Sequence, residues 1–123
     1  MTTMTQPKLT VKRGDIVLVL FPNSSLTSAK PRPALIVQAD DLQTELSQIV
    51  VAMISSQMFR AGHPSRVTIL LNSPEGKQSG LLTDSVVMTD NLATIVLSAV
   101  DRAIGSLPMT DIDAALKHTL GLS

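Results

Sequence analysis

The sequence predicts a mainly β protein, a small barrel followed by one amphipathic helix. Short apolar runs rich in Val, Ile and Leu recur through most of the chain, separated by Gly, Pro, Asn and Ser without helical spacing. Only the last segment carries apolar residues at helical spacing. The chain has 123 residues with no repeat and no linker composition. We therefore expect a single domain over residues 11–123, preceded by a flexible arm of residues 1–10.

The first half of the chain predicts three buried strands. Each is an apolar run, and turn residues separate one run from the next. The runs are residues 16–21, 34–37 and 49–54. The second run follows Pro31 and Pro33, whose rings force extended backbone immediately before it.

The second half predicts four further short strands, at residues 66–71, 80–82, 85–88 and 92–97. Residues 72–76 carry a proline where a type I turn accepts it. The following Gly76-Lys77 pair is expected in a polar hairpin turn. A nucleotide phosphate loop is not supported there, because Leu71 stands where such a loop has its first glycine.

The C-terminal segment predicts a helix that packs one face on the barrel. Residues 110–113 resemble a capping box, with Asp113 in place of the usual Glu or Gln. Gly121 is expected to end the helix. The apolar stripe consists of Ile112, Ala115, Leu116 and Leu120.

Composition excludes several classes of protein. The chain has no Cys, so disulfides, thiolate zinc sites and a cysteine nucleophile are excluded. The longest apolar runs are far shorter than the roughly 20 residues of a membrane helix. The first ten residues lack the apolar core of a signal peptide. We therefore expect a cytoplasmic protein without a membrane segment.

Charge is balanced overall but unevenly placed. Ten basic and ten acidic residues give a formal net charge of zero, which argues against binding nucleic acid by bulk charge. Residues 1–39, however, carry five basic residues and a single acidic one. The only aromatic residues are Phe21 and Phe59, so a base-stacking platform is excluded. A local basic site in the N-terminal third is compatible with this pattern.

Few residues are candidates for chemistry. His63 and His118 match no metal-ligand spacing, so we expect no metal site. His63 stands in a loop, where an acid–base role and an ordinary exposed histidine both stay open. Arg32 lies between two prolines, and this stiff backbone suits a guanidinium that must meet a phosphate at fixed geometry. The alternative for Arg32 is a surface arginine in a turn.

Several segments in unbroken order resemble the MazF/PemK family of toxins from bacterial toxin–antitoxin pairs. The resemblance spans residues from about Lys12 to Leu122. Its most specific part is the combination of Arg13-Gly14-Asp15 with the RPALIV run that begins at Arg32. The matching segments are residues 13–19, 21–22, 30–37, 51–56, 80–87, 94–95 and 104–107.

The resemblance implies an SH3-like barrel with a C-terminal helix, assembled as a homodimer and opposed by a cognate antitoxin. It also implies an endoribonuclease that needs no metal or other cofactor and cleaves single-stranded mRNA at short sequences through 2′-OH attack. The catalytic residues it implies are Arg32, Ser55 and Asp90. Expected substrate-binding residues are Lys30, Ser56 and Arg13.

The sequence departs from the family pattern at three positions. Leu26 stands at about the place of a histidine that some members have in the first loop. Met88 and Ala93 stand where some or many members have an arginine. These replacements favour an alternative, a catalytically silent barrel that binds RNA or a protein. A toxin that inhibits gyrase is a further alternative, because such toxins share the fold.

Overall fold

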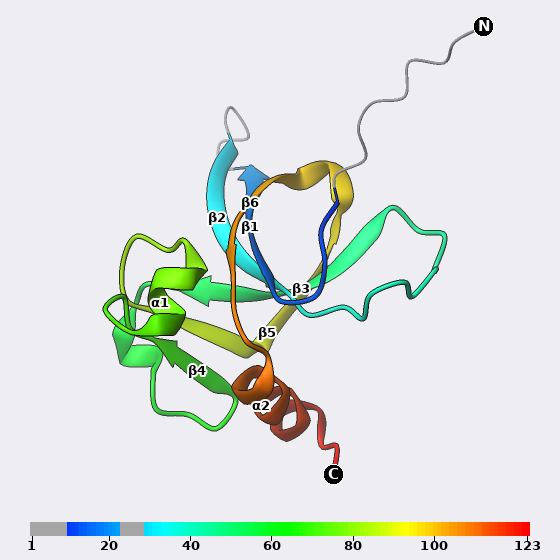
Figure 1. The fold of residues 1–123 in the computed structure, drawn as a ribbon. Coiled ribbons are helices and arrows are strands. Elements are labelled where there is room, and N and C mark those ends of the chain that lie inside the picture. The colour runs from blue at the N-terminus through cyan, green and yellow to red at the C-terminus, as the bar shows by residue number, and fades with distance from the viewer. Residues whose placement is uncertain (1–9, 23–28) are drawn as a thin grey trace, which may run out of the picture.

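The computed structural model describes residues 10–22 and 29–123. The predicted arm, apart from Thr10, and Leu26 lie outside the described residues. Six antiparallel strands form one sheet in the order β4-β5-β3-β2-β1-β6 (Figure 1). The mainly β fold with a C-terminal helix is therefore confirmed. The strands are β1 Asp15–Pro22, β2 Ala29–Ile36, β3 Gln48–Ser55, β4 Arg66–Ile69, β5 Ser85–Val96 and β6 Val100–Ser106.

The prolines of the second strand lie inside it and not before it, contrary to the prediction. β2 pairs with β1 along its whole length to Ala29, but its pairing with β3 ends at Ala34 opposite Met53. Alternate residues of a strand direct their N–H groups to the same edge, so Pro31 and Pro33 remove two donors from one edge of β2. Because pairing with β1 persists, that edge is the one toward β3. The two strands therefore separate beyond Ala34 and Met53.

The predicted hairpin after β4 is wrong. Residues 74–79 form a short helix, α1 (Pro74–Ser79). Ser73 is its N-cap and accepts a hydrogen bond from the Gly76 N–H at 3.0 Å, and Pro74 occupies the first turn. β4 ends at Ile69, and residues 80–82 form no strand.

The two strands predicted at residues 85–88 and 92–97 are one strand, β5. Its register against β3 jumps from Met88 opposite Met53 to Leu92 opposite Ala52. The residues between form a bulge, and their polar side chains resemble those of a turn. The edge strand β6 was not predicted. Two short 3-10 turns complete the layout, η1 (Met58–Arg60) and η2 (Leu97–Ala99).

The C-terminal helix α2 (Thr110–Leu120) is confirmed, although its predicted capping box is wrong. Its N-cap is Met109, which makes no side-chain cap, and Thr110 is already helical. Gly121 ends the helix in the left-handed conformation as expected, with φ 70°. Of the predicted stripe, Ile112 and Ala115 are buried. Within residues 10–22 and 29–123, no helix is long and apolar enough to cross a membrane.

The sheet is buried on both faces. Successive side chains of a strand point to opposite faces, so β1 contributes Ile16 to one apolar cluster and Val17 to the other. The first cluster packs beneath α2 and includes its Ile112. The second fills the opposite face; its buried members are Val17, Val19, Ala34, Ile36, Ile49, Val51, Ile95 and Val100.

Backbone contacts between α1 and β6 bridge the two ends of the sheet. A Cβ atom on Gly80 would lie 2.0 Å from the Ile104 carbonyl oxygen, and one on Gly105 would lie 2.3 Å from Ser79 backbone atoms. The Gln78 side chain donates to the Ser106 hydroxyl at 3.0 Å. Since α1 follows the edge strand β4, these contacts hold it against the other edge strand.

Candidate active site

Arg32 and Ser55 lie where β2 and β3 separate, a place we call the fork (Figure 1). The strand register sets Ala34 opposite Met53, so Arg32 and Ser55 each lie two residues beyond this last pair, where the two strands have separated. By strand alternation both side chains belong to the face of the second apolar cluster. The fork therefore places an arginine and a hydroxyl, one on each arm, at the rim of that cluster.

Arg32 is exposed, and no carboxylate among the described residues pairs with it. Its strand partner is Val19, which is fully buried. The described part of the chain gives Arg32 no ion pair, whereas Arg13, Arg66 and Arg102 each contact an aspartate. Val19, opposite Arg32 on β1, and Ala34, two residues further along β2, are both fully buried and hold this part of β2 in place. Arg32 is thus available to an anion from solvent.

Ser55 closes β3 opposite Val86 and is half-buried. Its Oγ accepts a hydrogen bond from the Gln57 N–H at 3.1 Å, which leaves its own proton free to donate. Ser56 follows as an exposed residue beyond the strand. Lys30 is exposed two residues before Arg32 and so belongs to the same face of β2. Ser55 and Ser56 thus lie on the β3 arm of the fork, and Lys30 and Arg32 lie on the β2 arm.

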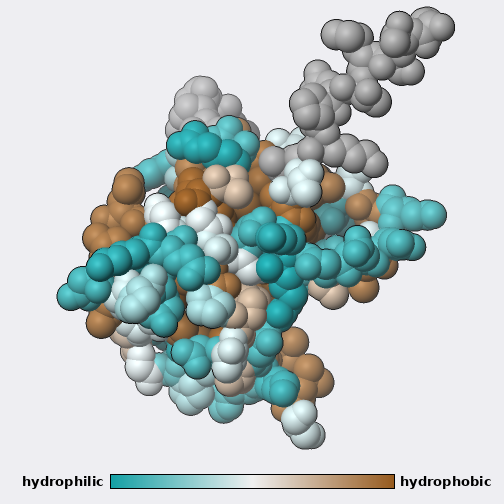
Figure 2. Space-filling view, viewed as in Figure 1, coloured by the Kyte–Doolittle hydropathy of each residue, from teal (hydrophilic) through white to brown (hydrophobic). Residues whose placement is uncertain are grey.

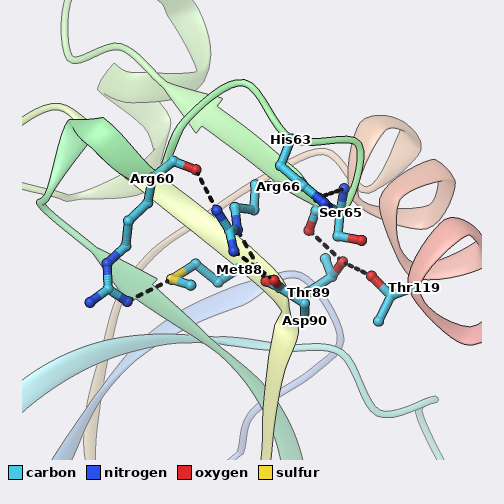
Figure 3. Close-up of polar contacts among 8 residues, drawn as sticks. All are labelled: Arg60, His63, Ser65, Arg66, Met88, Thr89, Asp90 and Thr119. Atoms are coloured by element: carbon cyan, nitrogen blue, oxygen red, sulfur yellow. Dashed lines mark hydrogen bonds and ion pairs between the residues drawn. The ribbon is translucent and has the colours of Figure 1, made fainter.

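Asp90 lies in the β5 bulge and forms a two-point ion pair with Arg66 (Figure 3). Arg66 Nη2 and Nε donate to its two carboxylate oxygens at 2.8 and 3.3 Å. These hydrogen bonds lower the pKa of Asp90 below its usual range and raise the pKa of Arg66. Asp90 is therefore ionised at neutral pH, and each of its oxygens accepts one hydrogen bond from Arg66. Its role as a base stays a prediction.

Arg60, at the end of η1, directs its guanidinium toward the Met88 sulfur (Figure 3). Its Nη1 lies 3.5 Å from the Met88 sulfur, and its Nε donates to the Gln57 side chain at 3.1 Å. The carbonyl oxygen of Arg60 accepts a hydrogen bond from Arg66 Nη1 at 3.1 Å. Arg60 is not predicted from the sequence, because no local pattern indicates that η1 directs its side chain toward Met88.

A buried threonine ties β5 to the loop before β4 and to α2. The Thr89 hydroxyl donates to the Ser65 carbonyl at 2.6 Å and lies 2.8 Å from the Thr119 hydroxyl (Figure 3). In the same loop, His63 Nδ1 accepts from the Ser65 N–H, and its ring stands edge-on to His118 with centroids 6.2 Å apart. These contacts hold the loop that leads from η1 into β4.

Arg13 is occupied in the packing of α2. Its guanidinium donates to the Val37 carbonyl at 3.0 Å and forms an ion pair with Asp113. Its backbone N–H donates to the Asp40 carboxylate. Arg13 thereby joins α2 to the end of β2, and its predicted contact with substrate stays a prediction.

Metal ligands do not gather in the described part of the chain. In residues 10–22 and 29–123, no group of three or more His, Cys, Asp or Glu side chains is placed to hold a metal ion.

Solved structures share this fold. An endoribonuclease in complex with its cognate antitoxin from a mycobacterial species superposes with a TM-score of 0.70 at 21% identity, over 93% of this chain and 98% of that chain. The Mycobacterium tuberculosis toxin MazF-mt6 gives 0.68 at 24% identity, over 89% and 98%. A Deinococcus radiodurans MazE–MazF structure gives 0.67 at 18% identity, over 92% and 97%. The fold is therefore that of MazF-type toxins.

A family model described as PemK-like, MazF-like toxin of type II toxin–antitoxin system matches residues 12–120. The chain belongs to this family, as its sequence motifs indicated.

Proposed function

We propose that this toxin is an endoribonuclease that cleaves single-stranded mRNA at short sequences, and that the fork between β2 and β3 is its active site. The observation that carries the proposal is the placement of Arg32 and the Ser55 hydroxyl on the two arms of the fork, with no ion pair to Arg32 among the described residues. The mycobacterial relatives described as endoribonucleases support the same activity.

The chemistry needs positive charge and hydrogen-bond donors around one phosphate. The 2′-OH of the RNA attacks the adjacent phosphorus, and charge grows on the non-bridging oxygens as the 5′-oxygen leaves. The Arg32 guanidinium offers a planar, permanently charged fork of donors to those oxygens. The Ser55 hydroxyl donates to a phosphate oxygen, with Lys30 and Ser56 beside it to position the strand. Asp90 remains the predicted acceptor of the 2′-OH proton.

The purified protein should cleave a long single-stranded RNA in the presence of EDTA. Attack by the 2′-OH leaves a 2′,3′-cyclic phosphate on one product and a 5′-hydroxyl on the other. Sequencing the product ends tests both the reaction and its short recognition sequence. Intact RNA would contradict the proposal, and inhibition of gyrase by the same sample would then favour the other toxin type.

We further propose a cytoplasmic homodimer that an antitoxin inhibits. Large apolar side chains reach the surface, among them Leu70, Leu71 and Leu82. Figure 2 shows apolar patches between hydrophilic areas on one face of the molecule. A dimer would cover part of this apolar area. The relatives solved with an antitoxin or with MazE support such a partner.

An acidic or amphipathic antitoxin segment should dock over the basic N-terminal region. Binding of the antitoxin encoded beside this toxin should weaken as salt rises, because charge attraction is screened. It should also weaken in Arg32→Ala. Calorimetry at several salt concentrations measures the affinity of wild type and of Arg32→Ala for the antitoxin. Light scattering of the free toxin tests the homodimer. Affinity indifferent to salt and to Arg32, or a 13 kDa monomer at micromolar concentration, would contradict these expectations.

A further inference from the structure

Arg60 is the second arginine of this region whose charge no carboxylate neutralises in the described part of the chain. Every contact that the structure gives its guanidinium is with an uncharged group: the Gln57 amide, the Met88 sulfur and the Phe59 ring, whose centroid lies 5.6 Å away. Thioether sulfur is a weak acceptor, and a guanidinium has five N–H donors. Arg60 is half-buried, and two of the five donors of its guanidinium have acceptors among the described residues.

The Arg60 head group contacts Met88, whose backbone lies near that of Ser55 in the sheet. Met88 stands opposite Met53, and Val86, two residues before it in β5, stands opposite Ser55. One strand spacing and two residues along the strand separate Met88 from Ser55, which amounts to about 8 Å between backbones. Met88 and Ser55 also share a sheet face. The distance between the backbones of Met88 and Ser55 is comparable with the distance between neighbouring phosphates of an extended RNA strand.

The position of Arg60 is fixed before any ligand arrives. Its carbonyl is held by Arg66, which is itself held by Asp90 at two points. The Arg60 N–H donates to the Gln57 carbonyl, and the Gln57 N–H donates to the Ser55 hydroxyl. Hydrogen bonds therefore link the end of β3 to η1, and the Arg66–Asp90 pair anchors η1 to β4 and β5 (Figure 3).

We infer that Arg60 binds an RNA backbone phosphate next to the one held at the fork and thereby fixes the register of the strand. This inference rests on the proposed function. We assign Arg60 a binding role, since its head group contacts Gln57, Met88 and Phe59, and no contact with Arg32 or Ser55 is present among the described residues. The Arg66–Asp90 pair has a positioning role, because it holds the turn that carries Arg60.

The test compares Arg60→Ala and Arg60→Gln with wild type and with Arg102→Ala. Arg102 is a matched control, because it is an exposed arginine of β6 with a side chain 68% exposed. Binding is measured by fluorescence anisotropy on a single-stranded RNA with every 2′-OH methylated, which removes the attacking group. Single-turnover cleavage is measured on the unmodified RNA at saturating protein.

Both Arg60 variants should bind about tenfold more weakly, as expected for one lost charged hydrogen-bonding partner. The slope of log affinity against log salt should fall by about 0.7, the value for one phosphate contact on a single strand. The saturating cleavage rate should stay within about threefold of wild type. Arg60→Lys should keep the salt slope, because it keeps the charge. Arg102→Ala should change none of these values.

Two results would overturn the inference while wild type still cleaves RNA. One is an RNA affinity of both Arg60 variants equal to that of Arg102→Ala. The other is unchanged RNA affinity with a loss only in the cleavage rate at saturating protein. Arg60→Gln retains a polar side chain and so guards against a folding defect in Arg60→Ala. A wild-type protein that neither binds nor cleaves RNA would overturn the proposed function itself, and the inference with it.

Discussion

Arg32→Ala should lose RNA cleavage almost completely while keeping its fold. Removing one preorganised charge that faces the transition state typically slows a reaction by roughly a hundredfold or more. The Arg32 side chain is exposed and makes no ion pair in the described part of the chain, so the free energy of unfolding should change by no more than about 0.5 kcal/mol. Single-turnover cleavage and thermal melting of the same samples measure the two effects.

Three companion variants separate charge from geometry at the fork. Arg32→Lys should recover little activity, since an ammonium does not reproduce the two-point contact of a guanidinium. Ser55→Ala should have a milder effect, because it removes one hydrogen bond and leaves the positive charge of Arg32 in place. Ser55→Thr should retain activity, because the hydroxyl remains. A fully active Arg32→Ala protein would remove Arg32 from the active site.

The strands that sequence analysis predicted well are those with uninterrupted apolar runs. β1 and β3 are buried on both faces, so nearly every residue in them is apolar and the run is visible without knowledge of the fold. β5 was divided in two because its bulge carries Thr89, Asp90 and Asn91. The helix α1 lies where the sequence predicts a turn, because Ser73-Pro74 can begin either structure. Close backbone packing against β6 favours the helix.

The candidate site was predictable only where the local backbone revealed it. Arg32 could be found because its flanking prolines mark a stiff segment. Arg60 could not be found, because its contact with Met88 joins residues 28 positions apart and depends on the Arg66–Asp90 pair. In the sequence, Met88 indicated a basic group lost from the family pattern. In the structure, the Arg60 guanidinium lies beside that methionine.

Gly80→Ala should lower the free energy of unfolding by more than the conformational cost of replacing a left-handed glycine alone. Gly80 has φ 72°, and a side chain in that region costs about 1 kcal/mol. The added Cβ would also lie 2.0 Å from the Ile104 carbonyl oxygen, and backbone there has no rotamer that moves it away. Separating α1 from β6 to relieve that overlap should cost about 2 kcal/mol more.

Gly121→Ala is the matched control for this substitution. Gly121 has a nearly identical φ of 70°, but a Cβ atom added there would have nothing within 4 Å. Gly121→Ala should therefore lower the free energy of unfolding only by the conformational cost, about 1 kcal/mol. Gly80→Ala should lose about 3 kcal/mol, which lowers the melting temperature by roughly 10 °C in a domain of this size. Urea unfolding of both variants measures the difference. If both variants lost the same free energy of unfolding, α1 and β6 could move apart at no cost. Close backbone packing would then not hold the two ends of the sheet together.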